Sequence, residues 1–532
     1  MTATSAPARP RPAAARPSAA WPAWRLLRLE LRRSPMPWTF PLLAALFAFD
    51  PYRTAMGYPA VWTIRASVLP NKLLPDFVVF VVAIAAWAGS RDGRRRTLDL
   101  VEITPRPRWA GQLAAWAATT IWAIAAFLAG TAVLYAVTAT QATWGGPPWW
   151  PVIVSCAELA ALAALGFTAG ALWPGRFTAP LAAVATFLLS LEGFRNAVGR
   201  SSAYAVLSPT TYVPGNDAGV FYRYPPDVAI DQLMFLAGLA VVALGVLGLA
   251  RSSGAGAGLR RGAAVAAAAG LAAAATAVGL AGTARQALPG TGRPPSATSP
   301  LGMQAAWVIP ALHDAASDRP LPYIPVCQTV AAVPVCIHPA FRVFLPDVTA
   351  ALGPVLREIA GLPGAPARAG QAASGSLVPR SGQVLVDWTP EGEISGTPPV
   401  FSYTADQVPA RSFGESRRAF VTGLQAALVA AFVPAGVGQP ATGAPAVPGR
   451  RTVPAVAARV AMQEALLMAA GVPLGTQRYQ GLIQVQLPRA AQAQADAAAQ
   501  RFAALPAATR HAWLARHLAA LRAGQLTLAR LP

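Results

Sequence analysis

Long apolar runs, separated by short loops that carry arginine, constrain the fold of this chain more than any other feature. A helix that crosses a bilayer needs roughly 20 predominantly apolar residues. Backbone polar groups inside lipid must pair within the chain, so such runs form helices. The composition agrees, because 54% of the 532 residues are hydrophobic and only 12% are charged. We therefore predict an α-helical polytopic membrane protein with six to seven transmembrane helices, followed by a mixed α+β extracytoplasmic domain.

The first apolar run allows two interpretations. It begins near Pro37 and either extends to Met56, so that Asp50 and Arg53 can pair one turn apart, or is broken at Pro51. The other expected spans cover about residues 75–89, 111–138, 151–173, 178–191, 232–250 and 262–282. The last consists largely of Ala, Val and Gly, which contribute little to insertion. If that segment stays out of the membrane, the carboxyl-terminal half lies in the cytoplasm.

The distribution of arginine predicts the orientation. Loops on the cytoplasmic side of a membrane are enriched in Lys and Arg. Arginines cluster in the amino-terminal region and in the loops at 90–110, 174–176 and 251–261. We therefore expect a plasma-membrane protein with a cytoplasmic amino terminus and an extracytoplasmic carboxyl-terminal domain. The outer segment 192–230 is an exception, since it also contains arginines.

The formal net charge of +21 does not indicate nucleic-acid binding. The charge is almost entirely arginine and is spread along the chain, with Lys72 as the lone lysine. No basic stripe with interleaved aromatic residues accompanies it. We expect the lipid bilayer, and no nucleic acid, among the partners.

Composition also suggests domain boundaries. Residues 1–20 resemble a disordered cytoplasmic tail, because they are rich in Pro, Ala and Arg and lack an apolar core. Residues 284–303 form a Pro/Gly/Ser linker, and the roughly 230 residues after it are enough to bury a core. The expected parts are a six-span membrane domain (21–250), a cytoplasmic loop with the seventh span (251–283) and an extracytoplasmic domain (304–532) with possible subdomains 304–432 and 451–532.

The segment 21–33 precedes the first span and has an amphipathic pattern. Trp24, Leu27 and Leu31 recur at helical spacing, and arginines occupy much of the remaining surface. This pattern is typical of a helix that lies flat in the membrane interface. The alternative is a charged flank ahead of the first span.

The loop 90–105 combines a basic cluster with an amphipathic stretch. Asp99 and Glu102 share one face of a short helix at i,i+3 spacing, and Leu98 lies on another face. We predict a short helix at the inner membrane surface. The candidate residues of this loop are Arg94, Arg95, Arg96, Thr97, Leu98, Asp99, Leu100, Glu102, Thr104 and Pro105.

Two of the three cysteines are close together in the predicted outer domain. Cys327 and Cys336 are nine residues apart, and an extracytoplasmic location favours a disulfide, which would contribute on the order of 2–3 kcal/mol. A metal site with His338 and a pair of free thiols are the alternatives. Cys156 lies in the fourth span and is expected to be a small buried apolar residue.

Glu158 is an acidic residue inside the fourth span. An ionisable group in the membrane is a functional candidate, because its burial in lipid is costly. The alternative is a packing residue that is protonated or paired with an outer arginine such as Arg53.

Known catalytic motifs are absent from the sequence. There is no H-E-x-x-H zinc-peptidase motif and no G-x-S-x-G nucleophile elbow, and a chain whose single lysine is Lys72 has no phosphate loop. We expect no intrinsic ATPase or protease activity, no cofactor and no metal. A membrane hydrolase would require a nucleophile and a base in the outer domain, where His338 with Asp347 is the one place to look.

The Arg94–Pro105 segment, with its basic turn, Thr-Leu-Asp-Leu stretch and Thr-Pro end, resembles the loop between the second and third spans of type-2 ABC exporter permeases, particularly the actinobacterial kind. The 21–33 segment is similar to their interfacial helix, so the resemblance covers about residues 20–250. It implies export driven by a separate ABC ATPase subunit that contacts the loop, and a homo- or heterodimer of permease subunits. The seventh span and the outer domain depart from the family pattern. Some relatives carry an aminopeptidase-like outer domain, but the missing H-E-x-x-H motif argues against that activity here.

A different class of function also fits the sequence. The chain would then be a polytopic membrane anchor that presents an extracytoplasmic binding or sensing domain and transports nothing. Association with an ATPase distinguishes the two classes.

Overall fold

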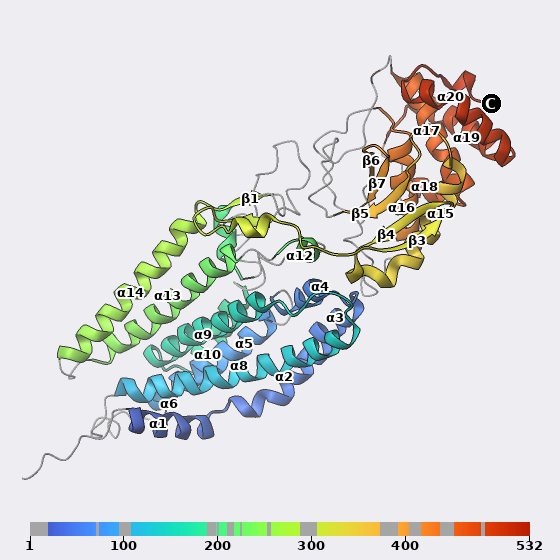
Figure 1. Ribbon diagram of the computed structural model, residues 1–532. Coiled ribbons are helices and arrows are strands. Elements are labelled where there is room, and N and C mark those ends of the chain that lie inside the picture. The colour runs from blue at the N-terminus through green and yellow to red at the C-terminus, as the bar shows by residue number, and fades with distance from the viewer. Residues whose placement is uncertain are drawn as a thin grey trace, which may run out of the picture.

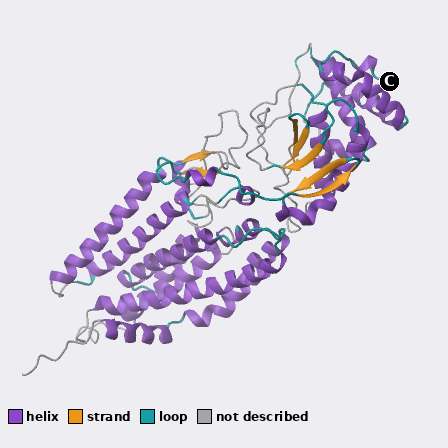
Figure 2. Cartoon of the chain, in the orientation of Figure 1, coloured by secondary structure: helices purple, strands orange, loops and turns teal. Residues whose placement is uncertain are grey.

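The computed structural model describes residues 20–70, 74–94, 108–188, 198, 202–209, 218–223, 226–252, 257–287, 306–372, 392–403, 417–436, 449, 452–479 and 485–532. Of the residues that the structure describes, 72% are helical. A bundle of long helices occupies one part, and a small mixed sheet with its own helices occupies the carboxyl-terminal part (Figure 1, Figure 2). The predicted combination of apolar helices and a mixed carboxyl-terminal region is confirmed.

Four helices among the described residues are long and apolar enough to cross a membrane. These helices are α8 (Arg108–Gln141), α9 (Trp149–Leu172), α13 (Asp227–Ala250) and α14 (Ala257–Ala281). The Ala-rich segment predicted as the seventh span is therefore one of the four. Two further apolar helices are shorter, namely α5 (Leu74–Gly89) and α10 (Thr178–Leu188).

The first apolar run is helical through Pro51. It comprises η1 (Met36–Thr39), α2 (Phe40–Phe47), η2 (Ala48–Tyr52) and α3 (Arg53–Gly57). Proline lacks an amide hydrogen and collides with the preceding turn of an α-helix. The wider π-helical turn η2 contains this proline, so the chain continues to Gly57 without a break.

Glycines allow the helices of the bundle to approach closely. α5 packs along α9, where a Cβ atom on Gly166 would lie 2.9 Å from the carbonyl oxygen of Val82, and one on Gly170 would collide with the carbonyl of Ala86. α13 packs along α14 in the same way, since a Cβ atom on Gly238 would lie 2.7 Å from the amide nitrogen of Ala274. Small residues at helix contacts are typical of membrane helix pairs, which lack a hydrophobic driving force.

The carboxyl-terminal part contains a five-stranded sheet with strand order β3-β4-β5-β7-β6. The β4–β5 and β5–β7 pairs are parallel, and the outer pairs are antiparallel. The strands are β3 (Val326–Val330), β4 (Val333–Ile337), β5 (Arg368–Gln371), β6 (Gly392–Ser395) and β7 (Val400–Tyr403). A separate antiparallel pair, β1 (Arg285–Ala287) with β2 (Ala306–Val308), follows α14.

One hydrophobic core joins this sheet to five helices. The helices α15 (Leu345–Ile359) and α16 (Arg417–Phe432) pack on the sheet, and α17 (Val453–Ala469) packs on both of them. The helices α19 (Arg489–Ala504) and α20 (Ala507–Arg522) complete the core. Segments 304–432 and 452–532 thus share one core. Arg510 of α20 also forms a 2.6 Å ion pair with Glu358 of α15.

The two ends of the bundle face different surroundings. α1 (Ala20–Arg33) packs along the first half of α8, near which α6 (Arg91–Arg94) also lies, and the end of α8 lies toward the carboxyl-terminal part (Figure 1).

Several predicted features lie outside the described residues. They are the tail before Ala20, the loop 95–107 and most of the linker (288–303).

Candidate functional site

A cavity of about 380 Å³ lies where α1, the α5–α6 region and α8 meet. Its walls include Glu30, Arg33, Ser34, Trp87, Arg91 and Arg94. Residues from α8 complete the walls, among them Thr119, whose hydroxyl donates to the carbonyl of Ala115 at 3.0 Å. The cavity lies at the end of α6. The predicted coupling loop, residues 94–105, which an ATPase subunit would contact, begins there.

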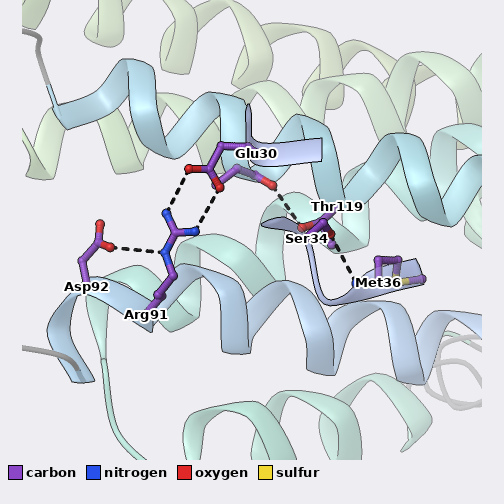
Figure 3. A network of polar contacts seen from close by, with 7 residues as sticks. Glu30, Ser34, Met36, Arg91, Asp92 and Thr119 are labelled. Atoms are coloured by element: carbon purple, nitrogen blue, oxygen red, sulfur yellow. Dashed lines mark hydrogen bonds and ion pairs between the residues drawn. The ribbon is translucent and has the colours of Figure 1, made fainter. Parts of the chain in front are cut away.

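An ion pair between Glu30 and Arg91 is the main polar contact in this cavity (Figure 3). Arg91 donates from Nη1 to Glu30 Oε2 at 2.9 Å and from Nη2 to Oε1 at 3.2 Å. It also donates from Nε to Asp92 at 3.4 Å. The hydrogen bonds to Glu30 raise the pKa of Arg91 above its usual value. Parallel hydrogen bonds between a guanidinium and a carboxylate are both strong and geometrically specific, so this contact defines how α1 sits against α6.

The helix α1 is also held against the bundle by its inward face. Glu30 and Ser34 on this face are buried, and Leu27 and Leu31 are half-buried. Trp122 of α8 donates from its indole nitrogen to the carbonyl of Leu31 at 3.0 Å. These contacts hold α1 against α8, and the Glu30–Arg91 pair joins it to α6.

Other residues of the predicted interfacial helix face outward. Trp24 is 59% exposed, and Arg28 and Arg32 are exposed. The structure therefore has an amphipathic helix in the predicted place, with its arginines on the outside and its half-buried leucines toward α8.

The predicted coupling loop is described only at its first residue. The guanidinium of Arg94 lies 3.2 Å from the ring centroid of Trp87 and donates to the Trp87 carbonyl at 2.9 Å. The other predicted residues of this loop, Arg95, Arg96, Thr97, Leu98, Asp99, Leu100, Glu102, Thr104 and Pro105, lie outside the described residues.

Glu158 is buried in α9, with 8% of its surface exposed. Its Oε2 atom has no hydrogen-bond partner among the residues that the structure describes. No ion pair with Arg53 is found among these residues. Glu158 and the cavity at α1 lie on different helices and do not form a common site among the described residues.

Cys327 and Cys336 form a disulfide, as the sequence predicts. They lie directly opposite each other on the antiparallel strands β3 and β4. The alternatives of a metal site and of two free thiols at these positions are wrong, because the two sulfur atoms are bonded to each other. The β3–β4 hairpin turns through Ala331 and Ala332, which have φ values of 50° and 64°. A non-glycine residue is strained there, and the disulfide holds the two strands together across this turn.

His338 follows β4 and is fully buried among aromatic rings. Ring centroids of Trp144, Phe221 and Tyr323 lie 5.1, 4.9 and 4.2 Å from the imidazole centroid. Its Nδ1 accepts a hydrogen bond from the amide of Ala340 at 3.1 Å, and burial lowers the pKa of His338 to about 4. Trp144 lies between α8 and α9, and Phe221 ends α12 (Ala218–Phe221), so His338 joins the sheet to the loops of the helix bundle.

Further contacts extend this junction. Thr143 donates from its hydroxyl to the carbonyl of Pro339 at 2.6 Å, and the amide of Leu321 donates to the carbonyl of Phe221 at 2.7 Å. The fully buried Asp227, at the start of α13, pairs with His313 at 2.9 Å. These contacts dock the carboxyl-terminal part on one end of the bundle.

The sequence interpretation missed Glu30 and Arg91 as site residues, and it considered His338 as a metal ligand or a base rather than as a junction residue. Glu30 is the single acidic residue in the basic segment 21–33, and that isolation is a signal for a buried ion pair. No local pattern identifies its partner 61 residues away.

Comparison with known proteins identifies no relative. No family model, no curated protein and no solved structure matches the chain.

Proposed function

We propose that this chain is the membrane-spanning permease subunit of an ABC exporter, driven by ATP hydrolysis on a separate ATPase subunit. The Glu30–Arg91 pair is the observation that carries the proposal. It connects the amphipathic helix α1 to α6, the helical turn from which the basic loop departs. A permease needs such a connection, because force applied to the loop by a partner has to reach the helices that move.

The mechanism follows from the contacts on both sides of the loop. The loop begins after α6 and ends at α8, and both elements pack on neighbouring helices of the bundle. A shift of the loop therefore moves α6 and α8 together with α1. The close α5–α9 contact at Gly166 and Gly170 transmits this movement to α9 as a rigid displacement. In a dimer of permease subunits, two such displacements open and close a path between the halves.

The orientation that fits this function has the amino terminus and the basic loop in the cytoplasm of a plasma-membrane protein. α8 extends from α1 toward the carboxyl-terminal part, which then lies outside the cytoplasm. Arginine-rich loops favour this orientation. The Cys327–Cys336 disulfide favours it independently, because disulfides persist in oxidising compartments.

Association with an ATPase tests the proposal. The tagged full-length chain is purified from its native membrane, and the bound proteins and the ATP hydrolysis rate are measured. We expect an ABC ATPase subunit to co-purify with the wild type. Asp99→Arg and Leu98→Asp should abolish coupled ATP hydrolysis while membrane insertion is unchanged. Unchanged coupled hydrolysis in both variants refutes the role of the loop. If no ATPase co-purifies, the chain is an anchor for its outer domain.

The ion pair is tested by a double-mutant cycle on Glu30→Ala and Arg91→Ala. The pair is bidentate and partly buried, with side-chain exposures of 10% for Glu30 and 32% for Arg91. Because solvent screens the charge of Arg91, the coupling energy of the pair should be about 1 kcal/mol. Arg28→Ala, on the exposed face of α1, serves as the control and should show no coupling to Glu30. A coupling energy of zero between Glu30 and Arg91 would show that apolar packing alone holds α1.

A further inference from the structure

Asp231 of α13 is a carboxyl group that the fold buries without a partner. Its exposed fraction is 0%, and both of its oxygens lack a hydrogen-bond partner in the described part of the chain. No ion pair of Asp231 is found among the described residues either. An isolated ionised carboxylate is costly to bury, so such a group is either neutralised by a proton or paired with a bound cation. Asp231 therefore needs a ligand from outside the described chain.

The face of α13 that carries Asp231 is covered by apolar side chains. Val228 and Gly238, at i−3 and i+7, share this face. Gly238 approaches α14 so closely that a Cβ atom would lie 2.7 Å from the amide nitrogen of Ala274. A buried apolar cluster joins α13 to α14, to β2 and to η5 (Ala203–Leu207), and its buried members are Val206, Leu207, Val228, Ala277, Ala281, Trp307 and Ile309. Asp231 thus lies beside an apolar contact that offers no charge to balance it.

Few ionisable groups face this carboxyl group from the elements packed around it. Residues 262–281 of α14 contain none. η5 contributes Tyr204, which is 45% exposed, and β1 contributes the exposed Arg285. α9 packs on another face of α13 and contains Cys156 and Glu158. Among the described residues, no group of three or more His, Cys, Asp or Glu side chains could hold a metal ion. A proton needs neither a set of ligands nor a cavity, so it is the ligand that fits.

Asp227 and His313 connect this carboxyl group to the surface. Asp227 is one turn before Asp231 on the same face of α13, and residues four apart on a helix are neighbours. It is also 0% exposed, and its Oδ1 atom has no partner in the part of the chain that the structure describes. Its Oδ2 atom lies 2.9 Å from Nδ1 of His313, whose side chain is 18% exposed. The three ionisable side chains therefore form a series that begins in the interior and ends at the surface.

We propose that Asp231 is a proton-binding site that is filled and emptied through Asp227 and His313. In the release direction, the carboxyl group of Asp231 gives its proton to Oδ1 of Asp227. Asp227 passes a proton from Oδ2 to Nδ1 of His313, and the resulting imidazolium releases a proton to water. Chains of Asp, Glu and His inside membrane helices are typical of proton relays. The proposal concerns the chain alone and does not rest on transport driven by an ATPase.

Infrared spectroscopy of the full-length protein in lipid nanodiscs tests the site. A protonated carboxyl group has a C=O stretching band that an ionised carboxylate lacks. We expect this band in the wild type at neutral pH, and we expect Asp231→Asn to lose part of it. Asp314→Asn, at an exposed acid, is the matched control and should keep the wild-type band. Glu158→Gln identifies the contribution of the buried acid of α9. A wild-type band that Asp231→Asn leaves unchanged would overturn the proposal.

Hydrogen–deuterium exchange of the same band tests the route. After transfer into heavy water, the band shifts as the proton is replaced by deuterium. Asp227→Asn and His313→Gln should each slow this replacement at least about tenfold, because positioned acid–base groups speed proton transfer by that factor or more. His517→Gln, on α20, should exchange at the wild-type rate. Unchanged exchange in both test variants would refute the route.

The pH dependence of folding gives a second, independent measurement. On the proposal, Asp231 keeps its proton in the folded chain but loses it on unfolding, above the ordinary titration range of a carboxyl group. The folding equilibrium constant of the wild type, divided by that of Asp231→Asn, should therefore fall about tenfold for each unit between pH 5 and pH 7. Both proteins retain His338, so its titration cancels in this ratio. A ratio that does not change with pH would show that Asp231 carries no proton in the folded state, which would also overturn the proposal.

Discussion

His338, which is buried where the carboxyl-terminal part meets the bundle, should make the stability of the protein fall as the pH falls. Burial among aromatic rings lowers the pKa of His338 to about 4, from an ordinary value of 6.5. The unfolded chain therefore binds a proton more readily than the folded chain between these two pH values. The stability contributed by the neutral ring is fully present above pH 6.5 and is lost as the pH falls toward 4.

The size of this effect follows from the difference in pKa. One pKa unit corresponds to about 1.4 kcal/mol, so the full shift amounts to about 3 kcal/mol, of which about 2 kcal/mol is lost at pH 5. Protonation of Nδ1 also removes the acceptor of the Ala340 amide. We therefore expect the carboxyl-terminal part to loosen from the bundle as the pH falls below 6.

The variant His338→Asn separates this titration from that of other groups. Asn does not titrate, and its side-chain oxygen can still accept the amide hydrogen of Ala340 at this helix N-cap. The measurement is the unfolding free energy of the full-length protein in mixed micelles between pH 8 and pH 5. The wild type should lose about 2 kcal/mol more over this range than the variant. His517→Asn, on α20 and outside the junction, should follow the wild type. Equal pH slopes for the wild type and His338→Asn would refute the reasoning.

Two further predictions concern backbone geometry. Gly170→Ala should destabilise the bundle by about 1–3 kcal/mol, because the added Cβ atom collides with the carbonyl of Ala86. Gly111→Ala, where nothing lies within 4 Å of the added atom, should leave the stability unchanged or raise it. Unfolding of both variants by SDS titration checks this pair of expectations. Ala331→Asn/Ala332→Gly should stabilise the β3–β4 hairpin by about 1–2 kcal/mol, since both positions have positive φ. If this variant and the wild type have the same melting temperature under reducing conditions, the prediction is contradicted.

Part of the fold could be predicted because it depends on local patterns. The segments 111–138 and 151–173 have continuous apolar sequences and form α8 and α9 with nearly the expected bounds. The Cys327–Cys336 disulfide follows from proximity in sequence, and the strands β3 and β4 place the two cysteines opposite each other. The Ala-rich helix α14 was predictable from its length and lack of charge.

Other features could not be predicted, because they arise from contacts between distant segments. Pro51 left two interpretations open, and a π-helical turn decides between them. His338 was considered as a metal ligand or a base, yet rings from three distant segments enclose it as a buried junction residue.

The sequence by itself determined the apolar, helical character of this protein, because hydropathy acts along the chain without reference to tertiary contacts. It also determined the amphipathic character of α1. Only the tertiary structure decided that Glu30 meets Arg91 and that one core unites the carboxyl-terminal helices. The physical reason is that a buried charge needs a partner, and the chain supplies that partner from a segment that no local pattern reveals.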